Sequence, residues 1–378
     1  MRLFQRRAAD AARPALVRSM SGFIAGGEWP RSYEGQVRDA YLANPVAQRA
    51  IRIVAEGAGG VPLYAKDEGV EGAVRAAALI AQPGLVETVA TQLLLHGNAF
   101  VLVSGDAEGL PAELFALRPE RVTIEQDARG WPAAYLYRAG EAVARYPAVD
   151  GAGRPSLVHL RATNPLDDHY GVGSLGPAAG AVAVHNAAAR WNKALLDNAA
   201  RPSGALVYEP GDGAALSAEQ FERLRREMEA GFAGAANAGR PMLLEGGLKW
   251  QAMSLTPADM DFVSLKAAAA REIALAFGVP PMLLGLPGDN TYANYSEANR
   301  ALWRLTIVPL IGKIAGGIAG GLRAWWPGVE VVPDLDQVPA LASDRQALWA
   351  QLSAADFLTV DEKREMLGFP PLPAGEGA

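Results

Sequence analysis

The segment between Arg201 and Pro281 constrains the fold more than any other part of the chain. Its pattern predicts a strand, a helix, a β-hairpin and a second helix, which ends at Gly278-Val-Pro-Pro281. An Ala-rich helix is predicted before this segment, and a long helix interrupted by Pro309 after it. We interpret the arrangement as two helices that carry a small α/β unit between them, a shape suited to a subunit of a ring.

Length and composition set broad limits on the class of protein. The chain has 378 residues, enough to bury a large core and to divide into two or three domains. Apolar residues make up 50% and charged residues 20%, which is typical of a globular protein. The sequence has no cysteine, which excludes disulfides, thiolate nucleophiles and cysteine-ligated zinc. Its net charge of −6 lacks the basic excess of a tight DNA binder, so any contact with nucleic acid is expected to be loose.

The N-terminal residues are rich in arginine: Arg2, Arg6, Arg7, Arg13 and Arg18 stand against Asp10 alone. Two interpretations stay open, a mobile arm and a basic tail that touches a neighbouring subunit or nucleic acid. Asp10, Arg13 and Pro14 break any apolar core that a secretory signal would need.

The apolar stretch Ala301–Trp326 contains four residues that a membrane span disfavours: Arg304, Pro309, Lys313 and Arg323. We therefore expect no membrane among the partners.

The first half of the chain predicts a compact α+β domain. Asn44 and Pro45 are a typical N-cap and first helical residue, and a second helix is predicted over Leu85–His96, ended by Gly97-Asn98. Short β-rich runs are predicted at Val61–Ala65, Ala99–Ser104, Leu114–Leu117, Val122–Glu125, Tyr135–Tyr137 and Leu157–Leu160.

The second half predicts mostly helices. Gly176-Pro177 begins a helix that runs to about Ala199, and Ala205–Tyr208 is a strand. Ser217 and Gln220 form a capping box. Gly246-Gly247, between Met242–Glu245 and Leu248–Met253, predicts a hairpin.

Further signals mark the remaining helices. Thr256-Pro257 with Asp259 opens a helix that ends at Gly278, and Asn294 with Glu297 opens a helix that reaches Arg323 with a kink at Pro309. A strand near Val329–Val332 and helices opened by Ser343 and by the Thr359–Glu362 capping box follow, the last closed by Gly368.

A glycine motif raises the possibility of an enzyme. Gly171-Val-Gly-Ser-Leu-Gly176 matches G-x-G-x-x-G, but the predicted strand ends near Arg161 and does not run into the first glycine. The acidic residue at the required spacing, Asp197, lies late in a helix. We favour a flexible loop that leads into a helix, and we keep an α/β nucleotide-binding enzyme as the alternative function.

Other reactive patterns are scarce. The four histidines, His96, His159, His169 and His185, form no metal-binding spacing. Asp167-Asp168-His169 resembles an acid/base or metal cluster, but a turn before a helix start is the simpler explanation. We expect no catalytic residues, no metal and no cofactor.

Two polar segments are candidates for contact with partners. Asp289, Asn290, Thr291, Tyr292, Asn294 and Tyr295 lie in one loop, whose tyrosines either stack on nucleic acid or pack beneath the loop. The helix after Ser217 alternates Arg223, Arg225 and Arg226 with Glu219, Glu222, Glu227 and Glu229, which indicates a solvated face or a seam between subunits.

Taken in order, these segments resemble the portal proteins of tailed bacteriophages, in the family that includes the phage HK97 portal. The resemblance rests on the following motifs: Asn44-Pro-Val46, Leu95-His-Gly-Asn-Ala99, Gly173-Ser-Leu-Gly-Pro177, Arg201-Pro-Ser-Gly204 and Gly278-Val-Pro-Pro-Met-Leu-Leu-Gly285 with Asn294 and Glu297. Their order and spacing together are specific.

The resemblance implies a portal-type subunit in which two stem helices carry a small α/β clip. By residue number it implies an N-terminal arm (1–40), an α/β wing (41–174), a stem helix (175–199), a clip (200–256), a second stem helix (257–278), a tunnel loop (279–295), a long kinked wing helix (296–327) and a C-terminal wing with a reduced crown (328–378).

The resemblance also implies a function without catalysis. Such subunits form a ring, typically of twelve, at one capsid vertex, where double-stranded DNA passes through the channel. The major capsid protein, the terminase large subunit and a head–tail adaptor protein are the implied partners. Asp289–Tyr295 would face the channel, and the clip would offer Glu222, Arg223, Arg226, Glu229, Leu248 and Trp250 to partners. An infectious phage, a prophage and a gene-transfer particle stay open as the source.

Overall fold

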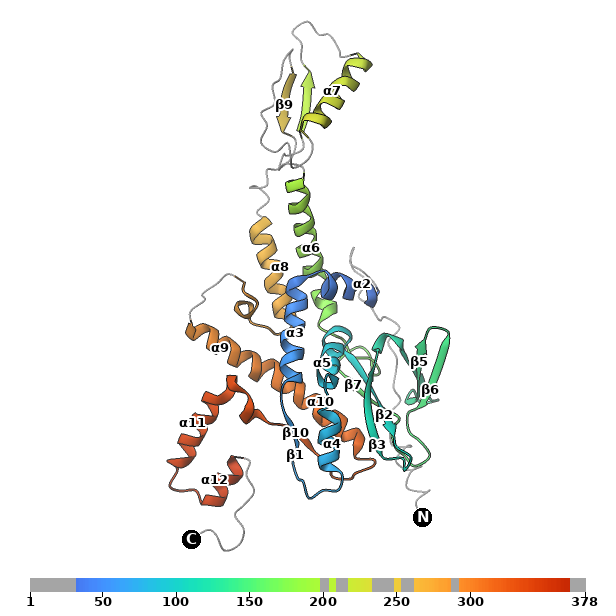
Figure 1. The fold of residues 1–378 in the computed structure, drawn as a ribbon, viewed down its shortest axis with the longest axis vertical. Coiled ribbons are helices and arrows are strands. Elements are labelled where there is room, and N and C mark those ends of the chain that lie inside the picture. The colour runs from blue at the N-terminus through green and yellow to red at the C-terminus, as the bar shows by residue number, and fades with distance from the viewer. Residues whose placement is uncertain are drawn as a thin grey trace.

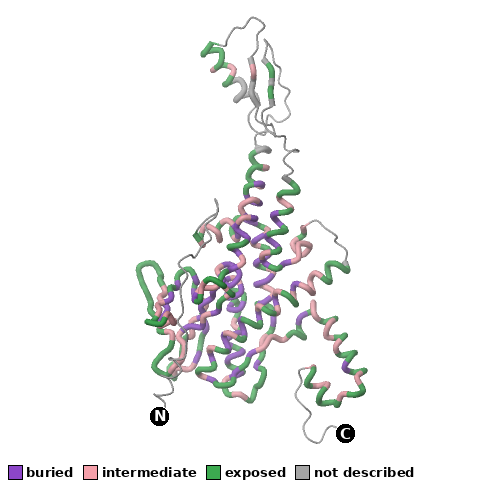
Figure 2. The backbone as a smooth tube through the Cα atoms, turned by 180° about the vertical axis from the view of Figure 1, so that it is seen from behind, coloured by how far each residue is buried: buried purple, intermediate pink, exposed green. Residues whose placement is uncertain are grey.

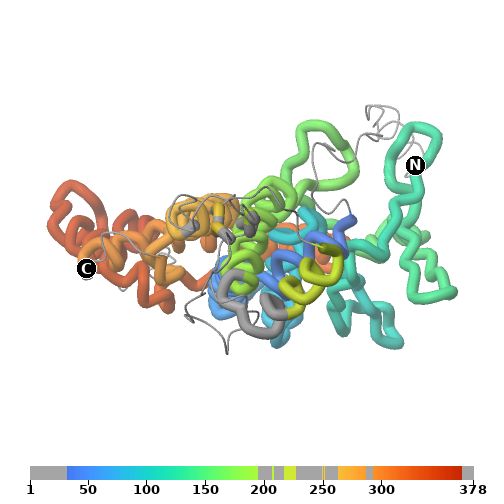
Figure 3. Tube along the Cα trace, turned by 90° about the horizontal axis from the view of Figure 1, so that it is seen from above, coloured from blue at the N-terminus to red at the C-terminus, as the bar shows by residue number. Residues whose placement is uncertain are grey.

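The computed structural model describes residues 32–197, 204–208, 217–232, 248–252, 262–286 and 292–367. They form an α/β body from which two helices project side by side, with a small α/β unit beyond the ends of those helices (Figure 1). Seen from above, the projecting pair lies near the middle, with the C-terminal helices on one side and the sheets of the body on the other (Figure 3).

The helices of the described residues are α2 (Tyr33–Val37), α3 (Pro45–Gly59), α4 (Ala73–Ile80), α5 (Leu85–His96), α6 (Leu175–Asp197), α7 (Ala218–Phe232), α8 (Phe262–Ala276), α9 (Tyr292–Leu302), α10 (Val308–Leu322), α11 (Ala342–Ser353) and α12 (Val360–Met366). Two π-helical turns, Arg38–Leu42 and Trp303–Ile307, and short 3₁₀ turns, among them Pro281–Leu284, join them.

The strands are β1 (Leu63–Ala65), β2 (Asn98–Gly105), β3 (Pro111–Leu117), β4 (Val122–Gln126), β5 (Pro132–Ala139), β6 (Ala142–Pro147), β7 (Leu157–Arg161), β8 (Gly204–Tyr208), β9 (Leu248–Ala252) and β10 (Val331–Pro333). All their pairings are antiparallel, in the sheet orders β3-β2-β7, β4-β5-β6, β1-β10 and β8-β9.

Helix α10 is the central helix of the main core. One face of it is fully buried, with Ile311, Ile314, Ile318 and Leu322 at zero exposure, and packs with α3, α4 and α5. The buried residues gather in the body (Figure 2). By length and composition alone, Ala293–Leu322 could cross a membrane. In the fold, this buried face gives the same apolar stretch a place in the core of the body.

The glycines of α10 fall into two groups. Side chains at Gly317 and Gly321 would collide with Leu160 and Val158, so these glycines let α10 lie close against β7. Side chains at Gly312, Gly316 and Gly320 would meet nothing within 4 Å. A glycine inside a helix costs about 1 kcal/mol relative to alanine, and no contact in the described part of the chain requires it at these positions.

A second, smaller core lies between the two three-stranded sheets. Phe100 of β2 is fully buried there, opposite Leu117 of β3 and His159 of β7. The Phe100 ring stacks on the His159 ring with centroids 4.2 Å apart, and the Tyr135 ring meets Phe100 edge-on at 5.8 Å.

The predicted pair of helices around a small α/β unit is confirmed. Helices α6 and α8 pack against each other along their length. Beyond them, β8 pairs with β9, with Val207 opposite Lys249. The predicted partner strand Met242–Glu245 and the helix start at Thr256 lie outside the described residues, as does Gly368.

Several predicted helix starts were wrong. Asn294 was expected to cap α9, but the helix begins at Tyr292 and Asn294 lies inside its first turn. Ser343 was expected to cap α11, yet the N-cap is Leu341, which makes no side-chain cap. The capping boxes at Ser217 and Thr359 are confirmed, the first with Gln220 N–H 3.2 Å from the Ser217 hydroxyl.

Three segments with regular structure were missed in the sequence. Residues 73–80, for which no element was predicted, form α4, and Ala142–Pro147 forms the edge strand β6. Residues 33–42, most of which fall in the expected arm, form α2 and a π-helical turn, and the Tyr33 ring packs edge-on against His96 at 4.8 Å. A π-helical turn, Trp303–Ile307, lies directly ahead of Pro309, where the sequence predicted a kink.

Candidate functional site

The projecting helix α6 is tied to the body by a buried polar cluster around Asn44. The Asn44 side-chain oxygen accepts hydrogen bonds from the backbone of Val46 and Ala47, both at 3.0 Å, and so caps α3. Its nitrogen donates to Asn186 Oδ1 of α6 at 2.9 Å and lies 3.1 Å from His185 Nδ1. The sequence predicted the cap but gave no sign of the partners, which lie more than 140 residues away.

The cluster continues to the turn before α3. Asn186 donates from Nδ2 to the carbonyl of Asp39 at 2.9 Å. Burial, with a smaller contribution from the charge of Lys266, lowers the pKa of His185. Since Asn44 Nδ2 is a donor, His185 presents a bare Nδ1 to it. One helix start, one turn and α6 therefore share a single hydrogen-bonded junction.

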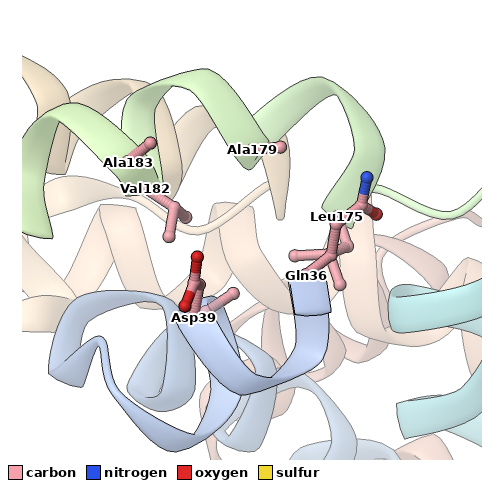
Figure 4. Close-up of a pocket in the computed structure, with 7 residues that line it drawn as sticks. Gln36, Asp39, Leu175, Ala179, Val182 and Ala183 are labelled. Carbon is pink, nitrogen blue, oxygen red and sulfur yellow. The ribbon is translucent and has the colours of Figure 1, made fainter. Parts of the chain in front are cut away.

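A small pocket lies beside this junction, between α6 and the turn that carries Asp39 (Figure 4). Its walls are mostly apolar and it has room for about one water molecule. It is lined by Gln36, Asp39, Ala40, Leu175, Ala179, Val182 and Ala183. A pocket of this size is too small for a nucleotide or cofactor.

A second buried polar residue, Asn98, holds the glycine motif. Asn98 Oδ1 accepts from Gly171 N–H at 2.8 Å, and Asn98 Nδ2 donates to the Gly171 carbonyl at 3.1 Å. Its side chain thus pairs with both backbone groups of one residue, as a neighbouring strand would. His159 Nε2 lies 3.1 Å from the same Oδ1, and because this oxygen only accepts, Nε2 carries the proton.

The expectation of a flexible loop at Gly171–Gly176 was wrong. Side chains at Gly171 and Gly173 would collide with the backbone of Leu95, Gly97 and Ala162, so the segment is packed tightly against the end of α5. Those glycines make room for protein backbone and leave none there for a phosphate. The last glycine, Gly176, is already in α6. This geometry removes the basis of the nucleotide-binding alternative.

The histidines and the acidic cluster have structural surroundings. Burial lowers the pKa of His96 to about 4 and, with smaller contributions from neighbouring charges, that of His159 to about 3. Asp167 Oδ1 accepts from the backbone N–H of His169 at 2.7 Å and of Tyr170 at 2.9 Å, which is the turn that the sequence offered as one explanation. Among the residues with described positions, no group of three or more His, Cys, Asp or Glu could hold a metal ion.

The candidate channel residues lie at the start of α9. Asn294 and Tyr295 are exposed on its first turn, Tyr295 by 52%, which favours contact with a partner over packing beneath a loop. Tyr292 is the first residue of the helix. Asp289, Asn290 and Thr291 lie outside the described residues.

The Gly278 motif contacts the π-helical turn that follows α9. Gly278 has a φ of +65°, which favours glycine, and its carbonyl accepts from Thr306 Oγ1 at 2.8 Å. A side chain at Gly278 would come within 2.7 Å of the same hydroxyl. The end of α8 is thereby fixed to the π-helical turn between α9 and α10.

Arg300 connects α9 to the C-terminal helices. Its Nη1 lies 2.9 Å from Glu297 Oε1, its Nε 3.3 Å from Asp344 Oδ1, and its Nη2 donates to Ser343 Oγ at 2.8 Å. The Arg300 side chain is 23% exposed. Ser343 and Asp344 lie in the first turn of α11, so this guanidinium joins the start of α11 to α9. No pattern in the sequence indicated this contact.

The candidate partner residues of the distal unit are only partly placed. On α7, Arg223 and Arg226 are exposed, while Glu222 is half-buried and pairs with Arg225 at 3.0 Å. Phe221, one residue before, is 56% exposed. Glu229 is on α7, and Leu248 and Trp250 are on β9. The twelve candidate residues therefore do not form one site, because six lie at the start of α9 or just before it and six in the distal unit.

Comparison with known proteins gives one consistent family. The family model described as phage portal protein matches residues 45–368. A chain in the neck of an empty gene transfer agent (GTA) particle, computed with C6 symmetry, is 46% identical, with a TM-score of 0.69, and the match covers 93% of this chain and 97% of that one. A chain in the neck of a native GTA particle, computed with C12 symmetry, is also 46% identical, with a TM-score of 0.67 and the same coverage.

Similarity to a phage protein supports the same family. The probable portal protein of Streptomyces phage phiC31 is 25% identical over 317 residues, which is 79% of this chain and 67% of the relative. The family match spans nearly all the helices and strands described above. The chain therefore belongs to the phage portal protein family, as its sequence motifs indicated.

Proposed function

We propose that twelve copies of this chain form a ring at one vertex of a capsid and that double-stranded DNA passes through the centre of that ring. One observation carries the proposal: α6 and α8 of this chain project from the body as a packed pair, with an α/β unit at their ends. The chain belongs to the portal family and is similar to a chain in a particle neck computed with C12 symmetry. Twelve such pairs side by side would enclose a channel.

Each part of the fold then has a place in the ring. Helices α6 and α8 are the stem, and α7 with β8 and β9 is the clip. The sheets with α3, α4 and α5 form the wing, α9 and α10 are the long wing helix, and α11 and α12 are a reduced crown. The start of α9, with Tyr292, Asn294 and Tyr295, lies at the tunnel.

The charge of the chain suits a channel that lets DNA slide. Each fixed basic contact to a phosphate adds a trap along the path, because binding to DNA is dominated by such ion pairs. The chain carries a net charge of −6, and the candidate tunnel residues, Asp289, Asn290, Thr291, Tyr292, Asn294 and Tyr295, include no arginine or lysine. Exposed Asn294 and Tyr295 can touch the duplex weakly as it passes.

The partners follow from the two ends of the subunit. The clip, with exposed Phe221, Arg223 and Arg226, is the docking surface for the terminase large subunit and later for a head–tail adaptor protein. The wing meets the major capsid protein. Hydrolysis of ATP during packaging belongs to the terminase, and this chain has a structural role.

Electron microscopy of the purified protein tests the proposal directly. Averaged top views should show a ring with twelve-fold symmetry and a central opening wide enough for B-form DNA. A stable monomer under assembly conditions, and also in capsids, would contradict the ring. A ring without a continuous opening would contradict the passage of DNA while leaving the assembly intact.

A further inference from the structure

The C-terminal helices α11 and α12 are firmly anchored but poorly covered. They stand off the body beneath α9 (Figure 1). Apart from the Arg300 contacts, Arg345 bonds the Leu367 carbonyl at 2.9 Å and Asp336 at 2.8 Å, which fixes the two helices to each other and to the chain before them. In the two helices together, Leu352 alone is buried.

Their outer surface is apolar and acidic. Phe357 is 86% exposed, and Val360, Met366 and Trp349 are exposed as well. The side-chain carboxylates of Asp356 and Glu365, next to Phe357 and Met366 in the sequence, have no ion-pair or hydrogen-bond partner within the described part of the chain. Helices of 12 and 7 residues are marginal on their own, so this surface is suited to being covered.

The outward face of α10 carries glycines and has basic residues beside it. Gly312, Gly316 and Gly320 lie on it, and each carries the cost of a helical glycine without a contact in this chain that needs one. Lys313 and Arg161 flank the glycines, and neither has an ion-pair partner among residues of known position. The charge of Arg161 acts on Lys313 and, after burial, lowers its pKa, so the two positive groups lie near each other.

We propose that α11 and α12 of one subunit dock on the outward face of α10 of the adjacent copy of this chain. The inference rests on the proposed ring, because a rotationally symmetric ring needs two different, complementary surfaces on each subunit. Phe357 and Met366 pack on the flat surface of Gly312, Gly316 and Gly320. Asp356 and Glu365 face Lys313 and Arg161, whose charges have the opposite sign.

Cross-linking between introduced cysteines tests this contact. The sequence has no native cysteine, so only the introduced thiols can react with the cross-linker. A full-length variant carries both G316C and F357C, at positions where a side chain meets open space or is already exposed. Rings of the variant are first verified by microscopy and then treated with a short bifunctional maleimide. We expect a ladder of covalent multimers on a denaturing gel.

Two controls and two contrary outcomes define the test. Each single-cysteine variant, and the pair G316C with V143C on the exposed edge strand β6, should give monomers. Intact rings of the double variant that stay monomeric on the gel would overturn the docking contact and leave the proposed ring standing. If no rings form even from the unaltered chain, both proposals fail.

Charge reversal tests the electrostatic half of the contact. K313E should lower the fraction of chains in rings several-fold, because it places like charges opposite each other. K313R should assemble normally, and K313E combined with E365K should recover assembly. Normal assembly of K313E, or a double variant worse than either single one, would overturn the proposed pairing.

Discussion

The side chain of Asn44 donates a hydrogen bond to Asn186 Oδ1 across 2.9 Å, and through it the start of α3 holds the projecting helix α6. The same side chain caps α3 with its oxygen. Asn44 is 1% exposed, so none of these groups can turn to water if a partner is lost. In a ring subunit, this junction would transmit force between the stem and the wing.

Replacement of Asn44 should therefore be costly. N44A loses the cap, worth about 1 kcal/mol, and leaves buried polar groups on α6 without a partner, at about 1–3 kcal/mol more. We expect a loss of about 2–4 kcal/mol in the free energy of unfolding, measured with urea. N44S keeps a capping oxygen but does not reach α6, so it should fall between N44A and the unaltered chain. Equal stability of all three would contradict the junction.

The glycine motif gives a prediction about packing rather than ligand binding. G173A places a Cβ against the backbone of Leu95 and Gly97, which cannot move aside as a side chain would, and should destabilise the body by roughly 1–3 kcal/mol. G176A, three residues on, meets nothing within 4 Å inside α6 and should be neutral or slightly stabilising. Thermal unfolding distinguishes them, and a neutral G173A would refute the close approach.

Acid should weaken the body through two buried histidines. Burial holds the pKa of His159 at about 3 and of His96 at about 4 in the folded chain, against about 6.5 when unfolded. The unfolded chain therefore binds more protons below pH 6.5, so stability is full above that pH and is lost as pH falls. The expected loss is about 1.4 kcal/mol per pH unit for each histidine.

Replacement of His159 separates its contribution to the pH dependence of stability from that of the acidic side chains. H159Q keeps a polar group near Asn98 but does not titrate, so its unfolding free energy should change less between pH 7 and pH 5 than that of the unaltered chain. In urea titrations at both pH values, the two changes should differ by about 2 kcal/mol, because the full 1.4 kcal/mol per pH unit applies only below the unfolded-state pKa of about 6.5. Parallel slopes would show that His159 is not held neutral.

Arg300 should control the order of the C-terminal helices. R300A removes the contacts to Asp344 and Ser343 and should speed hydrogen exchange of the backbone amides in α11 and α12. R304A is the matched control, because the Arg304 side chain is 64% exposed and its guanidinium lies 4.0 Å from Asp344, which is a longer and weaker ion pair than that of Arg300. Equal protection of these helices in both variants would show that another contact holds them.

The start of α9 carries a functional prediction. Tyr292→Ala and Asn294→Ala should leave ring assembly intact, because both residues lie in the first turn of α9 and Asn294 is exposed there, while DNA packaging or retention changes. Nuclease-protected DNA per particle is the readout, with ring yield measured in parallel. Normal packaging by both variants would remove these residues from the channel.

The sequence predicted those features whose signal and structure lie within one helical turn. Asn44 with Pro45, Ser217 with Gln220 and Thr359 with Glu362 mark helix starts, because each cap bonds backbone groups two or three residues away. Two of the starts that were missed or misplaced lack such a cap: α4 begins after Gly72 and α11 after Leu341, neither of which bonds the helix through a side chain. Helix α2 was missed although Ser32 caps it by accepting from Gly35 N–H.

Only the folded chain decides which distant polar groups meet. Asn98 pairs with the backbone of Gly171, Asn44 with Asn186, and Arg300 with Asp344, and the two members of each pair lie 44 to 142 residues apart. Residue type alone does not select such partners, because any buried asparagine or arginine must be satisfied by some group and packing decides which. The sequence by itself thus determined the helix pair, its distal α/β unit and the family, while the tertiary structure decided how those parts are fastened together.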